Sequence, residues 1–259
     1  MKIHVIDSSV AETSTTHLGN CNATGVRWSR LGSPEDYPLR LAVTELDDGG
    51  TLSWGTDHGD EAVYVMEGGL DVDGHVAPAD GAVIIESGVA AKATAVGTTR
   101  VAHFSPERSD PPLDGLYGPP SAERHTVHVL GPGAWYASGG RENVVARWFA
   151  DATCPTCRVQ LLHVARNGAS NGQGPQHSHT QDEIIHVLHG SVMLGKKALT
   201  AGMSLCIPAD IRYRISGGPD GYAFLNFRRD VSEQVYGGDR ATELEGGLAR
   251  GGVLVNDFR

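Results

Sequence analysis

The chain repeats itself at an interval of about 120 residues. The segment from Glu61 to Gly68 resembles the segment from Glu183 to Gly190: in both, a carboxylate precedes an apolar run that ends in glycine. Each match is short, but four in register indicate two copies of one structural unit. The other three pairs keep the same order and are 3–6 with 127–130, 26–28 with 146–148, and 40–43 with 158–161.

Both copies carry the pattern of β-structure. Short apolar runs alternate with glycine-rich turns, and no segment has a long apolar period of 3.6 residues. We therefore predict an all-β protein built as a sandwich or barrel. The predicted strands are 39–46, 62–66, 82–85 and 100–104 in the first copy, and 144–149, 158–164, 183–188, 203–207, 211–215 and 222–227 in the second.

The organisation predicted from these patterns is two domains and a linker. The stretch 111–124 contains two Pro-Pro pairs and no strand pattern, which is typical of a linker. The N-terminal domain is then 1–110 and the C-terminal domain 125–259. A chain of 259 residues is long enough for each domain to have its own core.

Composition excludes several classes of partner. A formal charge of −10 argues against nucleic acid and anionic membranes, which select a basic surface. No apolar run approaches the roughly 20 residues of a membrane span, and the start of the chain is too short and polar for a signal peptide. We expect a cytoplasmic protein. Four cysteines do not make a disulfide framework, and the Cys154-x-x-Cys157 pair is interpreted as an incidental loop feature.

The strongest chemical signal is the run from Pro175 to Glu183. His177 and His179 are two residues apart, so on a strand their imidazoles point to one face. Glu183 follows after a polar turn and supplies an oxygen ligand from the next strand. Two imidazoles and one carboxylate leave coordination positions open for substrate, water or O2. The pattern predicts a reaction centre with a metal ion.

The second copy resembles the cupin family. The spacing His177-x-His179-x3-Glu183-x6-Gly190 matches the first cupin motif, and Ile207-Pro208-Ala209 with the glycines before it resembles the second. The resemblance implies a bicupin, with two tandem jelly-roll (double-stranded β-helix) barrels, and one divalent metal ion in the C-terminal barrel. Family members also suggest a homodimer and a small-molecule substrate.

The first copy departs from this motif and is expected to be degenerate and metal-free. The positions of the two histidines hold Gly55 and Asp57, the carboxylate is Glu61, and the fourth position falls at or near Ala91.

In the second copy Tyr213 stands where the family has a fourth ligand, a histidine. Tyr213 is a candidate ligand, general acid or base, hydrogen-bond partner, or packed aromatic. We favour a three-ligand centre with Tyr213 beside it. Fe is the favoured metal, while Mn, Ni, Co and Zn also suit these donors.

Other pocket candidates are weaker. Gln160 and His163 lie on one predicted strand with opposite parity, so at most one points inward, and Asn226 is a polar residue in an apolar strand. They are assigned as candidate substrate-binding residues. His186 has the parity of an outer-face or interface residue, and His189 falls at a hairpin turn.

The sequence favours a metal-dependent enzyme acting on a small organic molecule. The leading hypothesis is an Fe(II)-type dioxygenase similar to quercetinase-like cupins. The alternative is redox-neutral isomerisation, cyclisation or lyase chemistry, in which Tyr213 moves a proton. A second alternative is a non-catalytic small-ligand-binding cupin, consistent with the missing fourth histidine.

Overall fold

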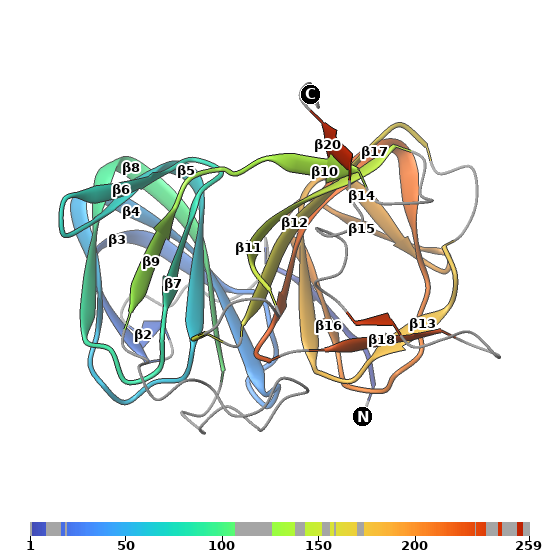
Figure 1. The fold of residues 1–259 in the computed structure, drawn as a ribbon, viewed down its shortest axis with the longest axis horizontal. Helices are drawn as coiled ribbons and strands as arrows, with labels where there is room; N and C mark the ends of the chain where they lie inside the picture. Colours follow the sequence, from blue (N-terminus) through green and yellow to red (C-terminus); the bar gives the residue numbers. More distant parts are fainter. Residues whose placement is uncertain are drawn as a thin grey trace.

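The computed structural model describes residues 2–8, 17–18, 20–106, 126–137, 143–151, 156–157, 159–169, 174–230, 232–236, 243–244 and 253–255. Within these residues the regular structure consists of twenty strands and no helix. The all-β prediction is confirmed. Two barrels lie side by side, one from each half of the chain (Figure 1).

The first barrel is an eight-stranded antiparallel sheet in the order β2-β3-β4-β8-β5-β7-β9, with β6 paired to β5. Its long central strands carry the apolar runs that the sequence predicted. The strands are β2 (His17–Leu18), β3 (Cys21–Leu31), β4 (Leu39–Trp54), β5 (Glu61–Val72), β6 (His75–Pro78), β7 (Ala82–Ile85), β8 (Ala91–Pro106) and β9 (Val127–Leu130).

The second barrel combines a nine-stranded sheet, in the order β1-β16-β14-β17-β12-β11-β10-β20 with β15 on β14, and a small sheet β13-β18-β19. The small sheet holds the histidine pair. The strands are β1 (His4–Asp7), β10 (Trp135–Ala137), β11 (Val144–Ala150), β12 (Gln160–Asn167), β13 (His177–His179), β14 (Glu183–Leu194), β15 (Lys197–Thr200), β16 (Met203–Ile207), β17 (Ile215–Arg228), β18 (Glu233–Tyr236), β19 (Glu243–Leu244) and β20 (Val253–Val255).

The two halves exchange strands. β1, at the start of the chain, pairs with β16 of the second barrel, and β9 pairs with β7 of the first. The main sheet of each barrel therefore has an edge strand from the other half of the sequence. The predicted linker 111–124 and Cys154 lie outside the described residues, and the division into two domains stays a prediction.

One predicted strand is wrong. Residues 211–214 form only an isolated bridge between Tyr213 and His177, and β17 begins at Ile215. A tight turn precedes them: Asp210 has φ +63°, and the Ile211 N–H donates to the Pro208 carbonyl at 3.3 Å. The chain has not returned to an extended path by residue 211. The strands at 82–85 and 203–207 coincide with the prediction, and most of the others extend beyond it.

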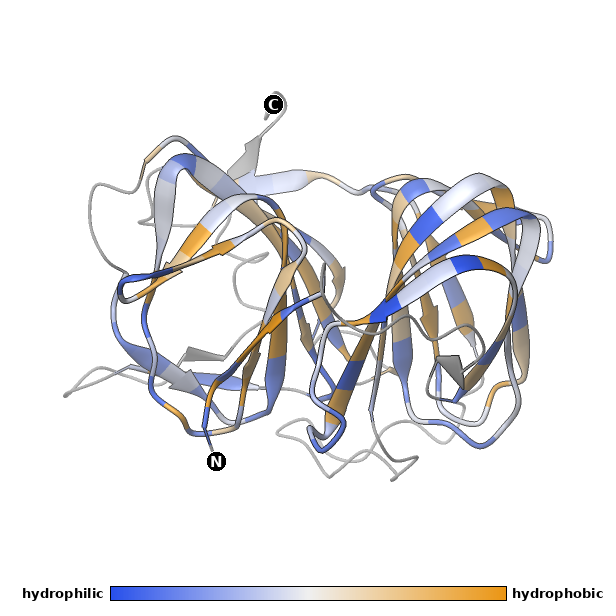
Figure 2. Cartoon of the chain, turned by 180° about the vertical axis from the view of Figure 1, so that it is seen from behind, coloured by the Kyte–Doolittle hydropathy of each residue, from blue (hydrophilic) through white to orange (hydrophobic). Residues whose placement is uncertain are grey.

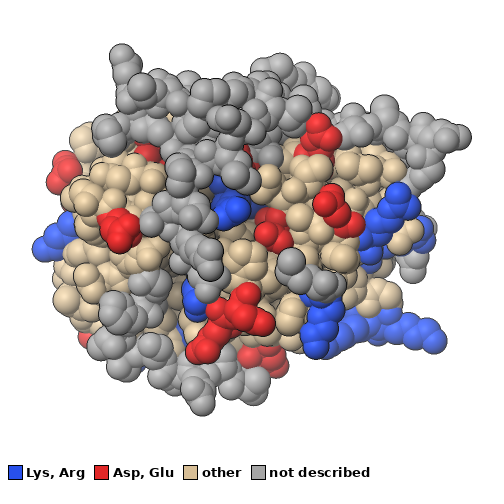
Figure 3. All heavy atoms as spheres, turned by 90° about the horizontal axis from the view of Figure 1, so that it is seen from below, with Lys and Arg blue, Asp and Glu red and all other residues tan. Residues whose placement is uncertain are grey.

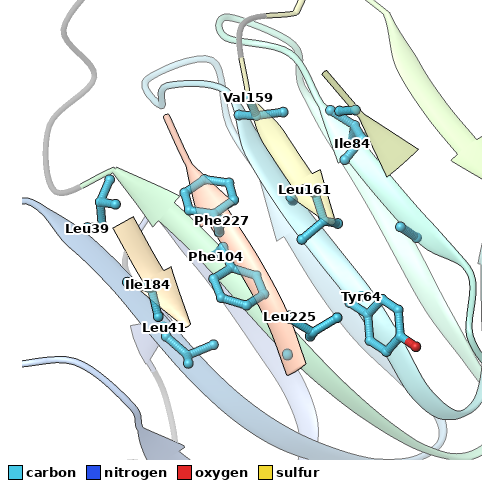
Figure 4. Packing of buried hydrophobic residues seen from close by; sticks show 14 of the residues in the cluster. Leu39, Leu41, Tyr64, Ile84, Phe104, Val159, Leu161, Ile184, Leu225 and Phe227 are labelled. Carbon is cyan, nitrogen blue, oxygen red and sulfur yellow. The ribbon is translucent and has the colours of Figure 1, made fainter. Parts of the chain in front are cut away.

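A shared hydrophobic core lies between the barrels. Leu41, Tyr64 and Phe104 from the first half pack with Leu161 and Phe227 from the second (Figure 4). The Phe104 and Phe227 rings stack with centroids 5.1 Å apart. Hydrophobic and hydrophilic residues alternate along many strands (Figure 2). One face of β17 packs between the barrels, so the alternate residues face the interior of the second barrel.

The motif glycine Gly190 is required by backbone geometry. Its φ of +65° favours glycine, and a Cβ there would lie 2.2 Å from the Gly221 carbonyl oxygen. The register of β14 against β17 shifts on both sides of this residue, so β14 bends here. Gly68, at the matching place in the first copy, has φ +77° and is equally crowded. The repeated glycine therefore marks a bend at matching places of β5 and β14.

The described residues contain no helix that is long and apolar enough to cross a membrane. On the face shown in Figure 3, acidic and basic side chains lie interspersed among neutral residues.

Candidate metal centre

The three predicted donors all lie buried in the second barrel. His177 and His179 lie on β13 and are buried, and Glu183 is the first residue of β14 and is fully buried. The two imidazole centroids are 5.0 Å apart, and His179 Nε2 lies 3.8 Å from Glu183 Oε1. The i, i+2 spacing thus places the two imidazoles beside each other, and the polar turn brings Glu183 next to His179; that the three bind a metal ion stays a prediction.

The backbone near His177 sets its tautomer. His177 Nδ1 lies 3.0 Å from the carbonyl oxygen of Pro175. A carbonyl only accepts hydrogen bonds, so Nδ1 carries a proton, and in the neutral ring Nε2 then has the lone pair. This arrangement is typical of histidines that ligate metals, because the outer hydrogen bond orients the ring.

Tyr213 reaches the same place without belonging to a strand. Its backbone N–H donates to the His177 carbonyl at 2.9 Å, and its own carbonyl accepts from the His177 N–H at 3.1 Å. The buried Tyr213 ring lies 4.6 Å from the His177 ring, centroid to centroid. The Tyr213 side chain also lies near enough to the Glu183 carboxylate to lower its pKa. Tyr213 therefore acts directly on a predicted ligand as well as packing in the barrel.

The Glu183 carboxylate is held in its ionised form. Burial alone would raise its pKa, but electrostatic interactions with His179 and Arg228, and hydrogen bonds from Tyr213 and Asn226, lower the pKa to about 2. Asn226 Nδ2 donates to Oε2 at 2.9 Å, and Arg228 Nη2 donates to the same oxygen at 2.7 Å. The other oxygen, Oε1, accepts no hydrogen bond of ordinary geometry from the described residues.

Arg228 is the site residue that the sequence analysis missed. It is 2% exposed, and its Nη2 also lies 3.1 Å from His179 Nε2. Strand alternation gives a signal for it: Asn226 is a candidate substrate-binding residue, and Arg228, two residues further on, lies on the same face of the strand. An arginine inside a barrel needs a paired carboxylate, and Glu183 is that carboxylate.

Of the weaker candidates, Gln160 and Asn226 lie on the inward face and His163 does not. Gln160 is fully buried and sits directly across the ladder from Arg228. His163 pairs in register with Leu225, on the face that packs between the barrels. Its Nδ1 lies 2.9 Å from the Tyr64 hydroxyl, and burial lowers its pKa to about 4. The assignment of His163 to the pocket is therefore corrected.

Two further histidines of the second copy, His186 and His189, also lie away from the donors. His186 is buried and its Nδ1 lies 3.0 Å from Ser204 Oγ, and His189 is exposed. The structure places His186 on the interface side, as its parity indicated.

A residue of the first half supports the centre from behind. The buried Tyr37 hydroxyl lies 2.7 Å from the Ile207 carbonyl oxygen and 3.0 Å from the Glu183 carbonyl oxygen. Glu183 and Ile207 face each other where β14 pairs with β16. Tyr37 thus ties the first half to the backbone that presents the Glu183 carboxylate. No local sequence pattern predicts such a long-range contact.

The matching carboxylate of the first barrel is engaged differently. Glu61 is fully buried, and its Oε2 lies 2.6 Å from His103 Nε2 and accepts from Trp54 Nε1 at 2.7 Å. Gly55 and Asp57, at the places of the two histidines, are exposed. The residues around Glu61 thus form a hydrogen-bonded cluster within the barrel.

The donor set of the second barrel fits a divalent ion in its chemistry. It offers two imidazoles, one ionised carboxylate and a carboxylate oxygen without an ordinary hydrogen bond. As the side chains stand, no three His, Cys, Asp or Glu among the described residues are close enough together to hold an ion. The guanidinium of Arg228 lies against two of the donors, so an ion that used both would require Arg228 to move.

Comparison with known proteins places the fold. No protein-family model matches the sequence, and no curated protein matches it. The structure resembles oxalate decarboxylase from Bacillus subtilis at pH 4.6, with a TM-score of 0.61 and 13% identity over 87% of this chain and 76% of that chain. A second structure of that enzyme, from work on its Mn(II) centres, matches with a TM-score of 0.61 and 12% identity, over 87% of this chain and 77% of that chain. At such identities the likeness establishes the fold alone, which is the jelly-roll architecture of cupins.

Proposed function

We propose that the second barrel is the centre of a divalent-metal-dependent enzyme that acts on a small organic molecule. The observation that carries this proposal is a buried cluster: the His177 and His179 imidazoles are 5.0 Å apart, Glu183 lies 3.8 Å from His179, and the Tyr213 ring lies 4.6 Å from the His177 ring. His177, His179 and Glu183 would hold the ion. Mn(II) and Fe(II) are the first ions to test, because this donor set suits both and Mn(II) is named for the structural neighbour.

The chemistry best supported at this centre is redox-neutral proton transfer, as in a lyase or isomerase. A bound divalent ion would supply Lewis-acid polarisation of a substrate oxygen. The Tyr213 side chain lies beside Glu183, where its hydroxyl would serve as general acid or base. The apolar side chains of Ile185, Val187 and Phe224 line the same interior cluster and exclude water.

Dioxygenation is the second candidate. It is favoured by the donor set itself, since two histidines and one carboxylate with open positions are typical of Fe(II) oxygenases. The two candidates differ in one measurable requirement. Redox-neutral turnover proceeds under argon, whereas dioxygenation consumes O2 in step with product.

The test begins with metal binding by untagged protein. We expect one Mn(II) or Fe(II) per chain by elemental analysis after anaerobic loading, and loss of that ion in His179→Ala. His189→Ala is the matched control, because His189 is an exposed histidine on the same strand as Glu183. Loaded protein is then assayed with small carboxylic acids, including oxalate, and enol substrates, in air and under argon. If the ion is absent from the unsubstituted protein, the enzyme proposal fails.

A further inference from the structure

Arg228 occupies an unusual position for a cation. It ends β17 on the interior face of the barrel and is 2% exposed. One nitrogen, Nη2, lies 2.7 Å from Glu183 Oε2 and 3.1 Å from His179 Nε2. A guanidinium stays protonated and only donates, so His179 Nε2 is the acceptor in this contact. The lone pair that would bind an ion is therefore used by Arg228.

The same guanidinium also neutralises the charge of the Glu183 carboxylate. The carboxylate of Glu183 is buried, and a buried charge is stable only when it is paired. Arg228 provides that pair without any metal. A divalent ion at His179 and Glu183 would bring further positive charge against the guanidinium, at a place that water screens little.

In the first barrel, the strand equivalent to β17 supplies a hydrogen-bond partner to the Glu61 carboxylate. β8 takes the place of β17 in the first barrel: Ala62 pairs with Phe104 there, as Ile184 pairs with Phe227 in the second. His103, one residue before Phe104, lies 2.6 Å from the Glu61 carboxylate. In both barrels this strand thus supplies a nitrogen donor to the carboxylate.

We propose that Arg228 is an internal competitor for the metal, which shares His179 and Glu183 with the ion and must leave them for the ion to bind. This inference rests on the proposed function. Arg228 then sets the metal affinity of the centre, and the protein alternates between an arginine-paired state and a metal-loaded state. Loading releases a guanidinium beside the reaction centre.

The experiment compares Mn(II) affinity in three full-length proteins. Free Mn(II) is followed by its EPR signal during titration of the unsubstituted protein, Arg228→Met and Arg228→Lys. We expect Arg228→Met to bind Mn(II) at least about tenfold more tightly, within the range by which partners of metal ligands change affinity. Arg228→Lys keeps the charge and is expected to stay close to the unsubstituted protein. Equal or weaker binding by a folded Arg228→Met overturns the proposal.

A second measurement uses the unsubstituted chain, in case the methionine variant fails to fold. The side-chain Nε–H signal of Arg228, assigned by its loss in Arg228→Lys, is followed by NMR during titration with Zn(II). We expect a shift that saturates with the bound ion, and an unmoved signal on binding overturns the competition. If all the proteins bind Mn(II) equally tightly, the competition fails while the metal centre stands. If none binds, both proposals fail.

Discussion

Tyr37→Phe isolates one hydrogen bond between the two halves of the protein. The hydroxyl of Tyr37 lies 2.7 Å from the Ile207 carbonyl oxygen and 3.0 Å from that of Glu183, and the residue is 2% exposed. Burial raises the pKa of this hydroxyl, so the proton stays in place throughout the ordinary pH range. Phenylalanine keeps the ring in the core and removes only the donor.

The size of the effect follows from there being one proton for two acceptors. Losing one hydrogen bond lowers the free energy of unfolding by about 1 kcal/mol. The loss rises to about 3 kcal/mol because the buried carbonyls are left without this partner. Glu183 and Ile207 are cross-strand partners, so the backbone that presents the carboxylate becomes less constrained. We expect the Mn(II) affinity to fall about tenfold, as when an outer partner of a ligand is removed.

Tyr64→Phe is the matched control. Tyr64 lies in the same core between the barrels, but its hydroxyl donates to Asp80 at 2.7 Å and does not contact the centre. Urea denaturation should give a comparable loss of stability in both variants, while Mn(II) titration should show weaker binding only in Tyr37→Phe. Equal Mn(II) affinities in the two variants would refute the idea that Tyr37 positions Glu183.

Three further predictions concern the fold. Phe227→Ala should lower the free energy of unfolding by about 3–5 kcal/mol, because it removes a fully buried ring stacked on Phe104; a loss below about 1 kcal/mol in urea denaturation would show that the core between the barrels contributes little. Gly190→Ala should destabilise strongly, because its φ is +65° and the new Cβ would lie 2.2 Å from a carbonyl oxygen; Gly74→Ala, at an open turn with φ +83°, is the control that carries only the backbone strain. Acid should destabilise the protein as the pH falls from 6.5 towards 4, since burial lowers the pKa of His163 and of His186 from 6.5 to about 4. In this pH range the unfolded chain binds protons at these histidines and the folded chain does not. The free energy of unfolding therefore falls by on the order of 3 kcal/mol per histidine by about pH 4. Melting curves that do not change between pH 7 and 4.5 would contradict this.

The sequence carries the local features of the fold. Alternation and glycine spacing predicted an all-β chain, and several strands were placed within a few residues. The i, i+2 pair His177 and His179 predicted two imidazoles on one face, because side-chain direction on a strand depends only on parity. The strand at 211–215 failed because a positive φ at Asp210 delays the extended path, and apolar alternation does not register such a turn.

Other features depend on contacts between distant segments. His163 was assigned to the pocket, yet its face of β12 meets the other barrel, and parity alone does not say which face lies inside. The exchange of β1 and β9, and the hydrogen bond from Tyr37 to the backbone of Glu183, also depend on long-range contacts. Each joins residues more than 40 positions apart in the sequence.

The sequence by itself determined the all-β fold and placed the side chains of His177 and His179 on one face of a strand, with Glu183 shortly after them. Only the tertiary structure decided what else lies at that point. Arg228 comes to Glu183 from 45 positions further along the chain, and its pairing depends on which faces of β14 and β17 enclose the interior. Packing of the two barrels sets that choice of face, because Leu225 and Phe227 fill the shared core and leave Arg228 inside.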